Sequence, residues 1–580
     1  MTTMVSLFGC ACVTAGLLAS AGASAAELYP PAPPPYHTLV EDGAPRAVIV
    51  LAQEPSHIEQ YAAAQLQRYI GKMSGVQLPI VPEGDAPKGY KLLVGKTKAL
   101  RGSKLQLNED AAGRDGFALV SNARRLIIAG RNDLGTLFGV YELLERHLGV
   151  RWFMPGDVGE VVPEMRTVRI GTLREIVKPA FDTRWVGTGE WSLKQRMNCH
   201  VSVEGEDVSV NWLWHFHTFR ILIPPEEHFD EHPEWFPLVN GKRKRPDREN
   251  SHSTQLCTSN PEVVRKLAEG MIGKLDEDPT IEIITLSPND GGGFCECDKC
   301  VALDEPERDW FARYSRRLAM LNAEVTRLVG EKHPNVLVKI GAYAMYARPP
   351  LDDGWRPPEN TLVQLCHIYF CHNHPIATGE CREGETYEAD DNFQPNQEFR
   401  RVLEQWRELT DHVYIYEYYA LGGFQRAQLP WAMVHTMRRD IPFYRDMGVK
   451  GFYTQLSANS WHRLGLNFYV AAKLAWNPDL DVDALLEDYF TKFYGPAAEP
   501  MQAYFMTLER AYTDYNGCIS YGLQSAPRIA KDIFTPAIMA DLGTHLQAAQ
   551  TAADTDIIKQ RVAMAEQMLQ ETKDSLAGGA

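Results

Sequence analysis

The sequence predicts an α/β protein built on a (β/α)8 TIM-type barrel, with a small α/β domain before the barrel and helices after it. Between residues 181 and 455, short strand-like apolar segments alternate with longer helix-like segments through eight cycles, which is the pattern of such a barrel. A shorter strand–helix series precedes it, and helical spacing continues after residue 482. The expected divisions are a signal peptide (1–26), an N-terminal domain (27–175), a barrel (176–480) and a helical region (481–580).

The first 26 residues are predicted to be an export signal. Met4–Ala21 is apolar and rich in small residues, and Ala23-Ser24-Ala25 fits the small-residue cleavage pattern. We therefore expect a periplasmic or secreted protein. No later segment has the roughly 20 apolar residues that a membrane span needs.

The charge balance argues against nucleic acid as a partner. The chain has 59 Lys and Arg against 75 Asp and Glu, a net charge of -16, whereas phosphate binding needs clustered positive charge. We expect no cofactor. The 12 Trp and 24 Tyr include flat faces that suit sugar rings, although most such residues belong to cores.

The N-terminal domain is predicted from alternating strand and helix patterns. In His57–Met73 the apolar residues recur at helical spacing. The other expected elements are the strands Ala47–Leu51 and Leu92–Gly95, a hairpin of Gly116–Val120 and Leu126–Gly130, and the helix Gly135–Leu148.

Eight strands are expected in the barrel, and an open doubly wound sheet is the structural alternative. The second strand has the weakest pattern, since a long polar and aromatic insertion follows it. The strands are Phe181–Val186, Asn198–Val203, Thr254–Cys257, Ile281–Leu286, Val336–Ala342, Leu362–Ile368, Val413–Tyr416 and Gly451–Gln455. The helices between them include Glu262–Leu275, Trp310–Glu331, Gln397–Asp411 and Trp431–Met447, and the chain ends in a helix from Pro536 to about Lys573.

Two carboxylates follow predicted strands at the mouth of the barrel, where barrel enzymes carry their catalytic groups. Asp290 follows the fourth strand and Glu417 the seventh. Glycoside hydrolysis uses such a pair, one group protonating the leaving oxygen and the other stabilising or attacking the anomeric carbon. Many barrel glycosidases have an Asn before the acid, as Asn289 stands here, although Asp replaces the more usual Glu. The structural alternative is that Asp290 caps a Pro-Asn-Asp-Gly-Gly turn.

Histidine and aromatic residues near the predicted mouth are candidates for sugar binding. His215 and His217 alternate along an extended segment, and a second histidine group ends the sixth strand. A satisfied loop histidine is the simpler interpretation of any single one. The predicted binding residues are Asn289, Arg184, Trp214, His215, His217, His367, Tyr369, His372, Tyr416, Gln455 and Trp461.

Cys295, Cys297 and Cys300 form a C-x-C-x2-C cluster directly after the Asp290 loop. Such a cluster can bind zinc, but a tetrahedral site needs a fourth ligand, and none stands at standard spacing. A disulfide or other structural role is favoured, and a metal site or a catalytic thiol stays open. In each case the cluster is expected to fix the loop that carries Asp290.

Several longer motifs resemble known families. His232–Leu238, Gln255–Pro261, the Leu286–Gly291 segment with its cysteines, and Tyr494–Ala498 resemble a bacterial family catalogued as domain of unknown function 4838. Residues 40–160, especially 135–145 and 148–153, resemble the N-terminal domain of alpha-glucuronidases and beta-hexosaminidases. The resemblance implies a glycosidase-like barrel with a companion domain, and it does not identify the sugar.

The preferred hypothesis is an exo-acting glycoside hydrolase whose substrate is an oligosaccharide containing a uronic acid or an amino sugar. Acidic sugars are favoured by the histidine groups, by the basic run Lys242–Arg245 and by the alpha-glucuronidase-like first domain. One alternative is a glycan-binding protein without activity. Another is a metal-dependent lyase or hydrolase that uses His215, His217 and the cysteines.

Overall fold

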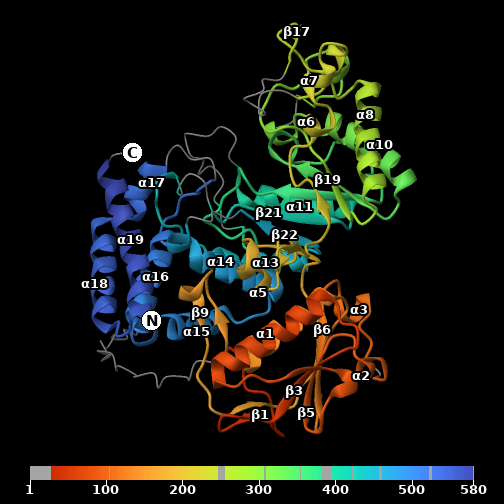
Figure 1. The fold of residues 1–580 in the computed structure, drawn as a ribbon. Coiled ribbons are helices and arrows are strands. Elements are labelled where there is room, and N and C mark those ends of the chain that lie inside the picture. The colour runs from red at the N-terminus through yellow and green to blue at the C-terminus, as the bar shows by residue number, and fades with distance from the viewer. Residues whose placement is uncertain are drawn as a thin grey trace, which may run out of the picture.

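The computed structural model describes residues 28–578, with gaps at 104, 246–254, 306–308, 353, 380, 382–393, 421–423, 425, 456–459 and 521–525. The predicted export signal lies outside the described residues. An N-terminal α/β unit, a central α/β unit and a group of C-terminal helices follow one another along the chain (Figure 1). No helix in the described part of the chain is long and apolar enough to cross a membrane.

The N-terminal unit is a six-stranded sheet with helices packed against it. Helix α1 (His57–Ser74) begins with a capping box between Ser56 and Glu59, which satisfies two backbone N–H groups at the helix start. Its apolar face is buried, together with residues of helix α4 (Asp133–Glu142). The strand order is β11 (Arg174–Val177), β6 (Phe117–Asn122), β7 (Arg125–Gly130), β5 (Tyr90–Val94), β3 (Ala47–Leu51) and β4 (Ile80–Pro82).

The central unit is a curled sheet of seven strands whose neighbours all pair in parallel. Helices α8 (Pro261–Glu277), α10 (Ser315–Lys332), α11 (Asn396–Leu409), α13 (Val434–Asp446) and α14 (Trp461–Trp476) follow its strands along the chain. The strand order is β12 (Thr183–Trp185), β22 (Gly451–Thr454), β21 (Val413–Glu417), β20 (Thr361–Cys366), β19 (Leu337–Ala342), β18 (Ile283–Leu286) and β15 (Trp212–Leu213).

The prediction of eight barrel strands is wrong for the second and third. Of the segment Asn198–Val203, Ser202–Val203 forms a strand, and it pairs in a small antiparallel hairpin with Glu206–Asp207. Thr254 lies outside the described residues, and 255–257 form no strand. The sheet position beside β18, the predicted fourth strand, is taken instead by the two-residue strand β15. A complete eight-stranded barrel is therefore not formed by the described residues.

Side chains and loop backbone bridge the two edge strands, β12 and β15. The Asn198 side chain accepts a hydrogen bond from the Arg184 backbone N–H at 2.8 Å, and the Asn198 carbonyl accepts one from Val210 N–H at 2.8 Å. The Trp185 ring on β12 stacks on His200 with centroids 3.9 Å apart. The sheet therefore curls far enough for its edges to share neighbours, although they do not pair with each other.

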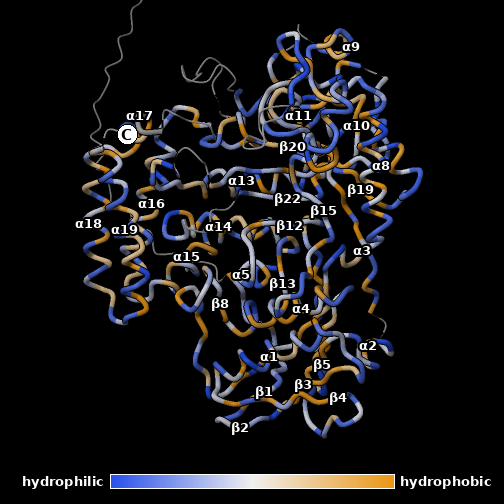
Figure 2. Tube along the Cα trace, turned by 45° about the horizontal axis from the view of Figure 1, so that its top comes forward, coloured by the Kyte–Doolittle hydropathy of each residue, from blue (hydrophilic) through white to orange (hydrophobic). Residues whose placement is uncertain are grey.

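The C-terminal helices α15 (Val482–Tyr494), α16 (Ala498–Thr513), α18 (Pro536–Ala552) and α19 (Asp556–Gly578) pack side by side next to the central unit (Figure 1). Hydrophilic and hydrophobic stretches alternate along α18 and α19 (Figure 2). The buried residues of α19 recur at helical spacing, as in Ile558, Val562, Ala565 and Leu569, so one face of this helix is covered.

Candidate active site

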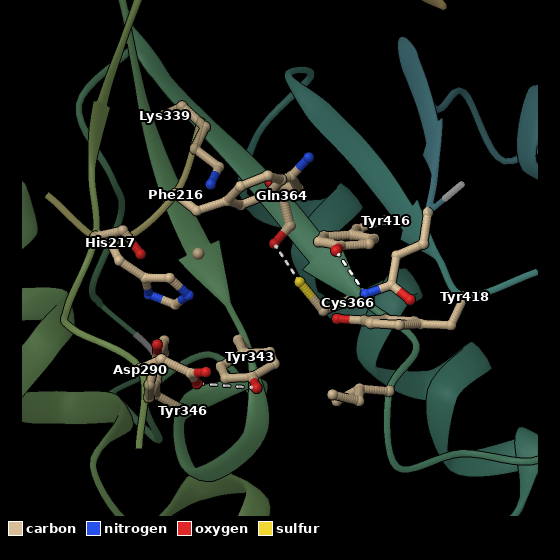
Figure 3. Close-up of a pocket in the computed structure, with 14 residues that line it drawn as sticks. Phe216, His217, Asp290, Lys339, Tyr343, Tyr346, Gln364, Cys366, Tyr416 and Tyr418 are labelled. Carbon is tan, nitrogen blue, oxygen red and sulfur yellow. Dashed lines mark hydrogen bonds between the residues drawn. The ribbon is translucent and has the colours of Figure 1, made fainter. Parts of the chain in front are cut away.

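A cavity of about 260 Å³ lies at the carboxyl ends of four neighbouring strands, β18 to β21 (Figure 3). Parallel α/β sheets carry their catalytic and binding groups at this end. Alternation along the strands explains which side chains enter it: Lys339 and Gly341 come from β19, Gln364 and Cys366 from β20, and Tyr416 from β21. The loops add Phe216, His217, Ser287, Asp290, Tyr343, Tyr346, Ile368, Tyr418 and Gln455.

Asp290 is the one carboxylate among the described residues that line this cavity. It follows β18 on a loop whose backbone is held by the buried Gln255 side chain. The Gln255 amide donates to the Asn289 carbonyl at 2.6 Å and accepts from the Asn289 N–H at 2.9 Å. The Tyr343 hydroxyl donates to Asp290 Oδ1 at 3.3 Å (Figure 3). Burial, followed by the charge of Asp290, raises the pKa of Tyr343, so this hydroxyl stays protonated.

Lys339 and Gln364 are buried polar groups of the cavity wall. Lys339 Nζ donates to the His215 carbonyl at 3.0 Å and lies 5.1 Å from the centroid of the Phe216 ring. Burial lowers the pKa of Lys339 to about 8. In the described part of the chain, neither side-chain polar atom of Gln364 has a hydrogen-bond partner. Buried polar groups are nearly always hydrogen-bonded, so this amide is available to a ligand or to water in the cavity.

Two parallel tyrosine rings form one wall. The rings of Tyr416 and Tyr418 stack with centroids 4.5 Å apart and an interplanar angle of 6°. Gln455 Nε2 donates to the Tyr416 hydroxyl at 3.1 Å (Figure 3). The cavity therefore combines flat aromatic faces with an acid, an ammonium group and amides.

The predicted position of Glu417 at the mouth of this cavity is wrong. Tyr416 and Tyr418 line the cavity, so Glu417 points to the opposite face of the sheet. There it is 1% exposed, lies 3.1 Å from His367 Nδ1 and accepts a hydrogen bond from the Tyr444 hydroxyl. Burial alone would raise the pKa of Glu417, but the charge and hydrogen bond of His367 outweigh it and lower that pKa.

The same buried network accounts for a second histidine group. His367 Nε2 lies 3.0 Å from Asn396 Oδ1, opposite its contact with Glu417. His372 packs against His367 with ring centroids 4.7 Å apart, and burial lowers the pKa of His372 to about 3. Both rings are buried and neither lines the cavity, so they do not lie where the predicted contact with substrate would be made.

The first histidine group divides between two cavities. His217 lines the main cavity, with Nδ1 2.9 Å from the Pro288 carbonyl. His215 lines a separate cavity beside His200 and Asp207, and burial lowers the pKa of His215 to about 3. Their predicted use as a joint ligand pair is therefore not supported by their positions.

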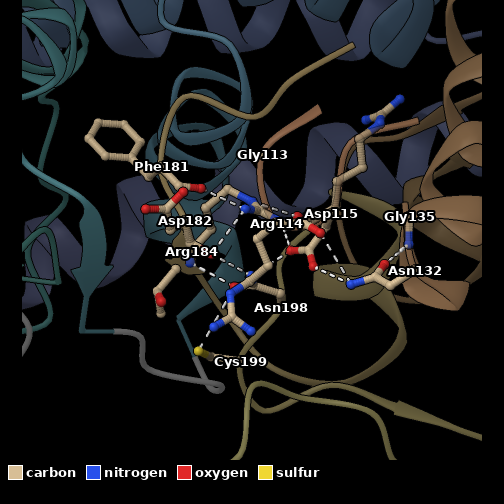
Figure 4. Close-up of polar contacts among 12 residues, drawn as sticks. Gly113, Arg114, Asp115, Asn132, Gly135, Phe181, Asp182, Arg184, Asn198 and Cys199 are labelled. Carbon is tan, nitrogen blue, oxygen red and sulfur yellow. Dashed lines mark hydrogen bonds and ion pairs between the residues drawn. The ribbon is translucent and has the colours of Figure 1, made fainter. Parts of the chain in front are cut away.

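Arg184 was predicted to bind substrate, but it joins the N-terminal and central units instead (Figure 4). Its side chain is fully buried and its guanidinium binds Asp115 Oδ2 at 2.8 Å and the Phe181 carbonyl at 2.6 Å. Asp115 Oδ2 also accepts from Asn198 Nδ2 at 2.7 Å, and Asp115 Oδ1 accepts from Asn132 Nδ2 at 3.0 Å.

The remaining predicted residues lie outside the cavity lining. Asn289 Oδ1 accepts from the Arg220 backbone N–H at 3.1 Å, and Trp214 adopts a left-handed backbone conformation with φ 56°. Tyr369 packs edge-on against Trp310, and Trp461 starts helix α14 against Trp191. Of the predicted residues, the cavity thus brings together Asp290, His217, Tyr416 and Gln455.

Two sulfur-rich groups could hold metal ions. Cys295, Cys297 and Cys300 are joined by Cys257, and the four sulfur atoms lie within 4.8 Å of one another. Sequence spacing missed Cys257 as the fourth member, because it precedes the cluster by a helix and a strand. The second group consists of Cys371, His374, Cys381 and Cys518, whose potential ligand atoms also lie within 4.8 Å of one another.

Solved structures of two other proteins align with most of this chain. The chain aligns with a family GH115 4-O-methyl-alpha-glucuronidase with specificity for decorated arabinogalactans, at 13% identity and a TM-score of 0.57, covering 93% of this chain and 73% of the other. That score indicates a shared fold. The N-acetyl-beta-hexosaminidase of Streptomyces plicatus aligns at 13% identity and a TM-score of 0.42, covering 82% of this chain and 93% of the other. No curated protein matches the chain.

Family models match both parts of the chain. Residues 37–143 match the model described as Glycosyl hydrolase family 67 N-terminus, which confirms the resemblance to the alpha-glucuronidase N-terminal domain. Residues 154–507, more than half of the chain, match the model described as Domain of unknown function (DUF4838). The chain therefore belongs to the DUF4838 family.

Proposed function

We propose that this protein is a glycoside hydrolase that acts on an acidic oligosaccharide, with Asp290 as its acid/base and Lys339 as the group that binds the carboxylate of the sugar. The observation that carries the proposal is the placement of Asp290 and Lys339 in one cavity at the carboxyl ends of the sheet. Stacked tyrosine rings and the free amide of Gln364 suit a sugar ring and its hydroxyl groups.

Asp290 would act by donating a proton to the leaving glycosidic oxygen and taking one from water afterwards. The hydrogen bond from Tyr343 orients this carboxyl group within the cavity. The low-dielectric surroundings strengthen the attraction between an ammonium group and a sugar carboxylate. Lys339 would thereby fix the orientation of a uronic acid.

The second catalytic function is not assigned to Glu417, which faces the other side of the sheet. Among the described residues, the cavity lining holds one carboxylate. Some glycosidases need no carboxylate nucleophile, since an acetamido group of the substrate attacks the anomeric carbon. This observation favours an amino sugar as the second candidate substrate.

The size of the cavity supports action at a chain end. Its volume of about 260 Å³ lies just below the roughly 300–1,000 Å³ of common ligand pockets, which suits one terminal sugar unit. Export of the protein, predicted from residues 1–26, is part of the same proposal because it would bring the enzyme to glycans outside the cell.

The test is a screen of uronic-acid-containing, N-acetylated and neutral oligosaccharides, followed by kinetics of three variants. Asp290→Asn is expected to lower kcat/KM by about 10²- to 10⁴-fold. Lys339→Met is expected to raise KM for the acidic substrate and leave a neutral analogue unaffected. Asp554→Asn, an exposed acid in the loop between α18 and α19, is the matched control and should retain full activity.

Three outcomes would overturn the proposal. Tight glycan binding without product would favour a binding protein, and full activity after exhaustive chelation together with unchanged turnover by Asp290→Asn would remove the assigned acid. Activity lost on chelation but unaffected in Asp290→Asn would favour the metal-dependent alternative.

A further inference from the structure

We propose that the protein binds two zinc ions at structural sites. The first is formed by Cys257, Cys295, Cys297 and Cys300, and the second by Cys371, His374, Cys381 and Cys518. The argument rests on the spacing of the ligand atoms, their burial and their chemistry. It does not depend on the proposed reaction.

The sulfur atoms of the first group have the spacing of a tetrahedral zinc site. Cys257 Sγ lies 3.7 Å from Cys297 Sγ and 3.9 Å from Cys300 Sγ. In a regular tetrahedron with Zn–S bonds of about 2.3 Å, two sulfur atoms are about 3.8 Å apart. A disulfide would bring two of them to about 2.05 Å, so the arrangement fits a shared ion and not a bridge.

The surroundings of the first group suit thiolates. Cys257, Cys295 and Cys300 are buried. The Leu238 backbone N–H donates to Cys295 Sγ at 3.3 Å, and the Ser259 hydroxyl lies 3.1 Å from Cys300 Sγ. Such outer hydrogen bonds orient metal ligands. Arg243 Nη1 lies 3.8 Å from Cys295 Sγ, where its charge partly offsets the net negative charge of four thiolates around Zn²⁺.

The second group fits a site with three sulfurs and one nitrogen. His374 Nδ1 lies 3.4 Å from Cys371 Sγ, 3.6 Å from Cys381 Sγ and 3.6 Å from Cys518 Sγ. A tetrahedral ion with Zn–N of about 2.0 Å and Zn–S of about 2.3 Å places these atoms about 3.5 Å apart. All three cysteines are buried. Because their number is odd, a disulfide within the group would leave one of them as a free thiol.

The ligand types point to zinc in a structural role. Thiolate and imidazole ligands select zinc over the hard cations magnesium and calcium. Four protein ligands close the coordination sphere, as in structural sites, whereas catalytic sites keep a position for water. Each cysteine that binds gives up its thiol proton.

Each site joins segments that are far apart in the sequence. The first ties the segment before α8 to the loop after β18 and to helix α9 (Asp298–Val301), which contains Cys300. Gln255, two residues before Cys257, binds the backbone on both sides of Asp290, at Asn289 and Gly291. The ion would therefore position the Asp290 loop from both ends, through Gln255 and through Cys295. The second ties the loop after β20 to the C-terminal region.

Metal analysis of the purified protein tests the proposal directly. Inductively coupled plasma mass spectrometry is expected to find two zinc ions per chain, and one in each of the variants Cys300→Ser and Cys518→Ser. Cys199→Ser, a buried cysteine outside both groups, is the matched control and should retain two. A count of zero or one in the unmodified protein would overturn the two-site proposal.

A second measurement keeps the test decisive if a variant fails to fold. The unmodified protein is exchanged with Co²⁺, and thiolate-to-metal charge-transfer absorption is expected at two equivalents. In parallel, the denatured chain is alkylated without reductant and weighed. Full alkylation of these seven cysteines supports the proposal, while a disulfide between any two of them contradicts it.

Discussion

Burying an ammonium group without a carboxylate partner is costly, and no carboxylate among the described residues pairs with Lys339. It stands in the middle of β19 between Val338 and Ile340, and its Nζ donates to a backbone carbonyl. Gln364 occupies the same kind of position on β20. A charged or amide residue inside an otherwise apolar strand is the sequence signal that marks both residues, which lie within strands and not in the loops that follow them.

Binding of an acidic sugar is expected to weaken as the pH rises through about 8, the pKa to which burial lowers Lys339. The protonated form attracts the anion, and deprotonation removes the attraction. If only the protonated form of Lys339 binds the sugar, binding is about tenfold weaker one pH unit above that pKa than at low pH. Isothermal titration calorimetry between pH 6 and 9 measures the effect. Lys339→Arg should remove the pH dependence, and an unchanged dependence in that variant would assign it to another group.

In the unliganded protein, the contribution of Lys339 to the free energy of unfolding changes with pH in the opposite direction to the binding affinity. The folded-state pKa of Lys339 lies below its ordinary value of 10.5, so the unfolded chain binds more protons between these two values. This lysine therefore destabilises the fold below about pH 8, and its contribution to the free energy of unfolding improves as the pH rises toward 10.5.

Glu417→Gln is expected to affect stability more than catalysis. Removing one member of the buried pair with His367 leaves the other without its charge partner, which lowers the free energy of unfolding by roughly 3–5 kcal/mol. Urea denaturation measures that loss, and turnover per folded molecule should stay within about tenfold of the original. A fall of about 10³-fold at unchanged stability would restore Glu417 as a catalytic group.

At the level of elements, strand prediction succeeded where strands are long, apolar and buried. The segments Ile281–Leu286 and Val336–Ala342 contain β18 and β19, and Leu362–Ile368 covers all of β20 except its first residue. It failed at Asn198, whose side chain bonds to the backbone of a neighbouring strand, and at the two-residue β15, which is too short for any periodicity. Glu417 shows a further limit of strand prediction. The prediction located its strand, β21, but alternation alone does not tell which set of alternate side chains faces the cavity, and that set proved to be Tyr416 and Tyr418.

The loop after β18 makes a separate prediction. Gln255→Ala removes the hydrogen bonds that hold Asn289 and Gly291, so Asp290 loses its fixed position. A misplacement of about 1 Å can cost about 10²-fold in rate; we therefore expect kcat to fall about 10- to 100-fold with little change in KM. Steady-state kinetics and zinc content are compared with Gln567→Ala, an exposed glutamine of α19. A rise in KM alone would indicate a binding role for this side chain.

At the scale of the whole molecule, polar contacts join the N-terminal unit to the central sheet. Asp115 accepts direct hydrogen bonds from Arg184 and Asn198, both buried (Figure 4). A second contact, Arg114 with Glu282, has side chains that are 29% and 43% exposed. Since Asn198 also bridges the open edges of the curled sheet, the companion unit helps to fix the curvature that forms the cavity.

The two contacts should therefore differ in strength. Asp115→Ala leaves the Arg184 charge buried and unpaired, and the free energy of unfolding should fall by roughly 3–5 kcal/mol. Glu282→Gln, at the same interface but exposed to solvent, should cost less than about 1 kcal/mol. Urea denaturation measures both, and replacing Arg184 by Met in the Asp115→Ala background should recover much of the loss because the unpaired charge is removed. Equal effects of the two single variants would mean that the buried pair does not hold the units together.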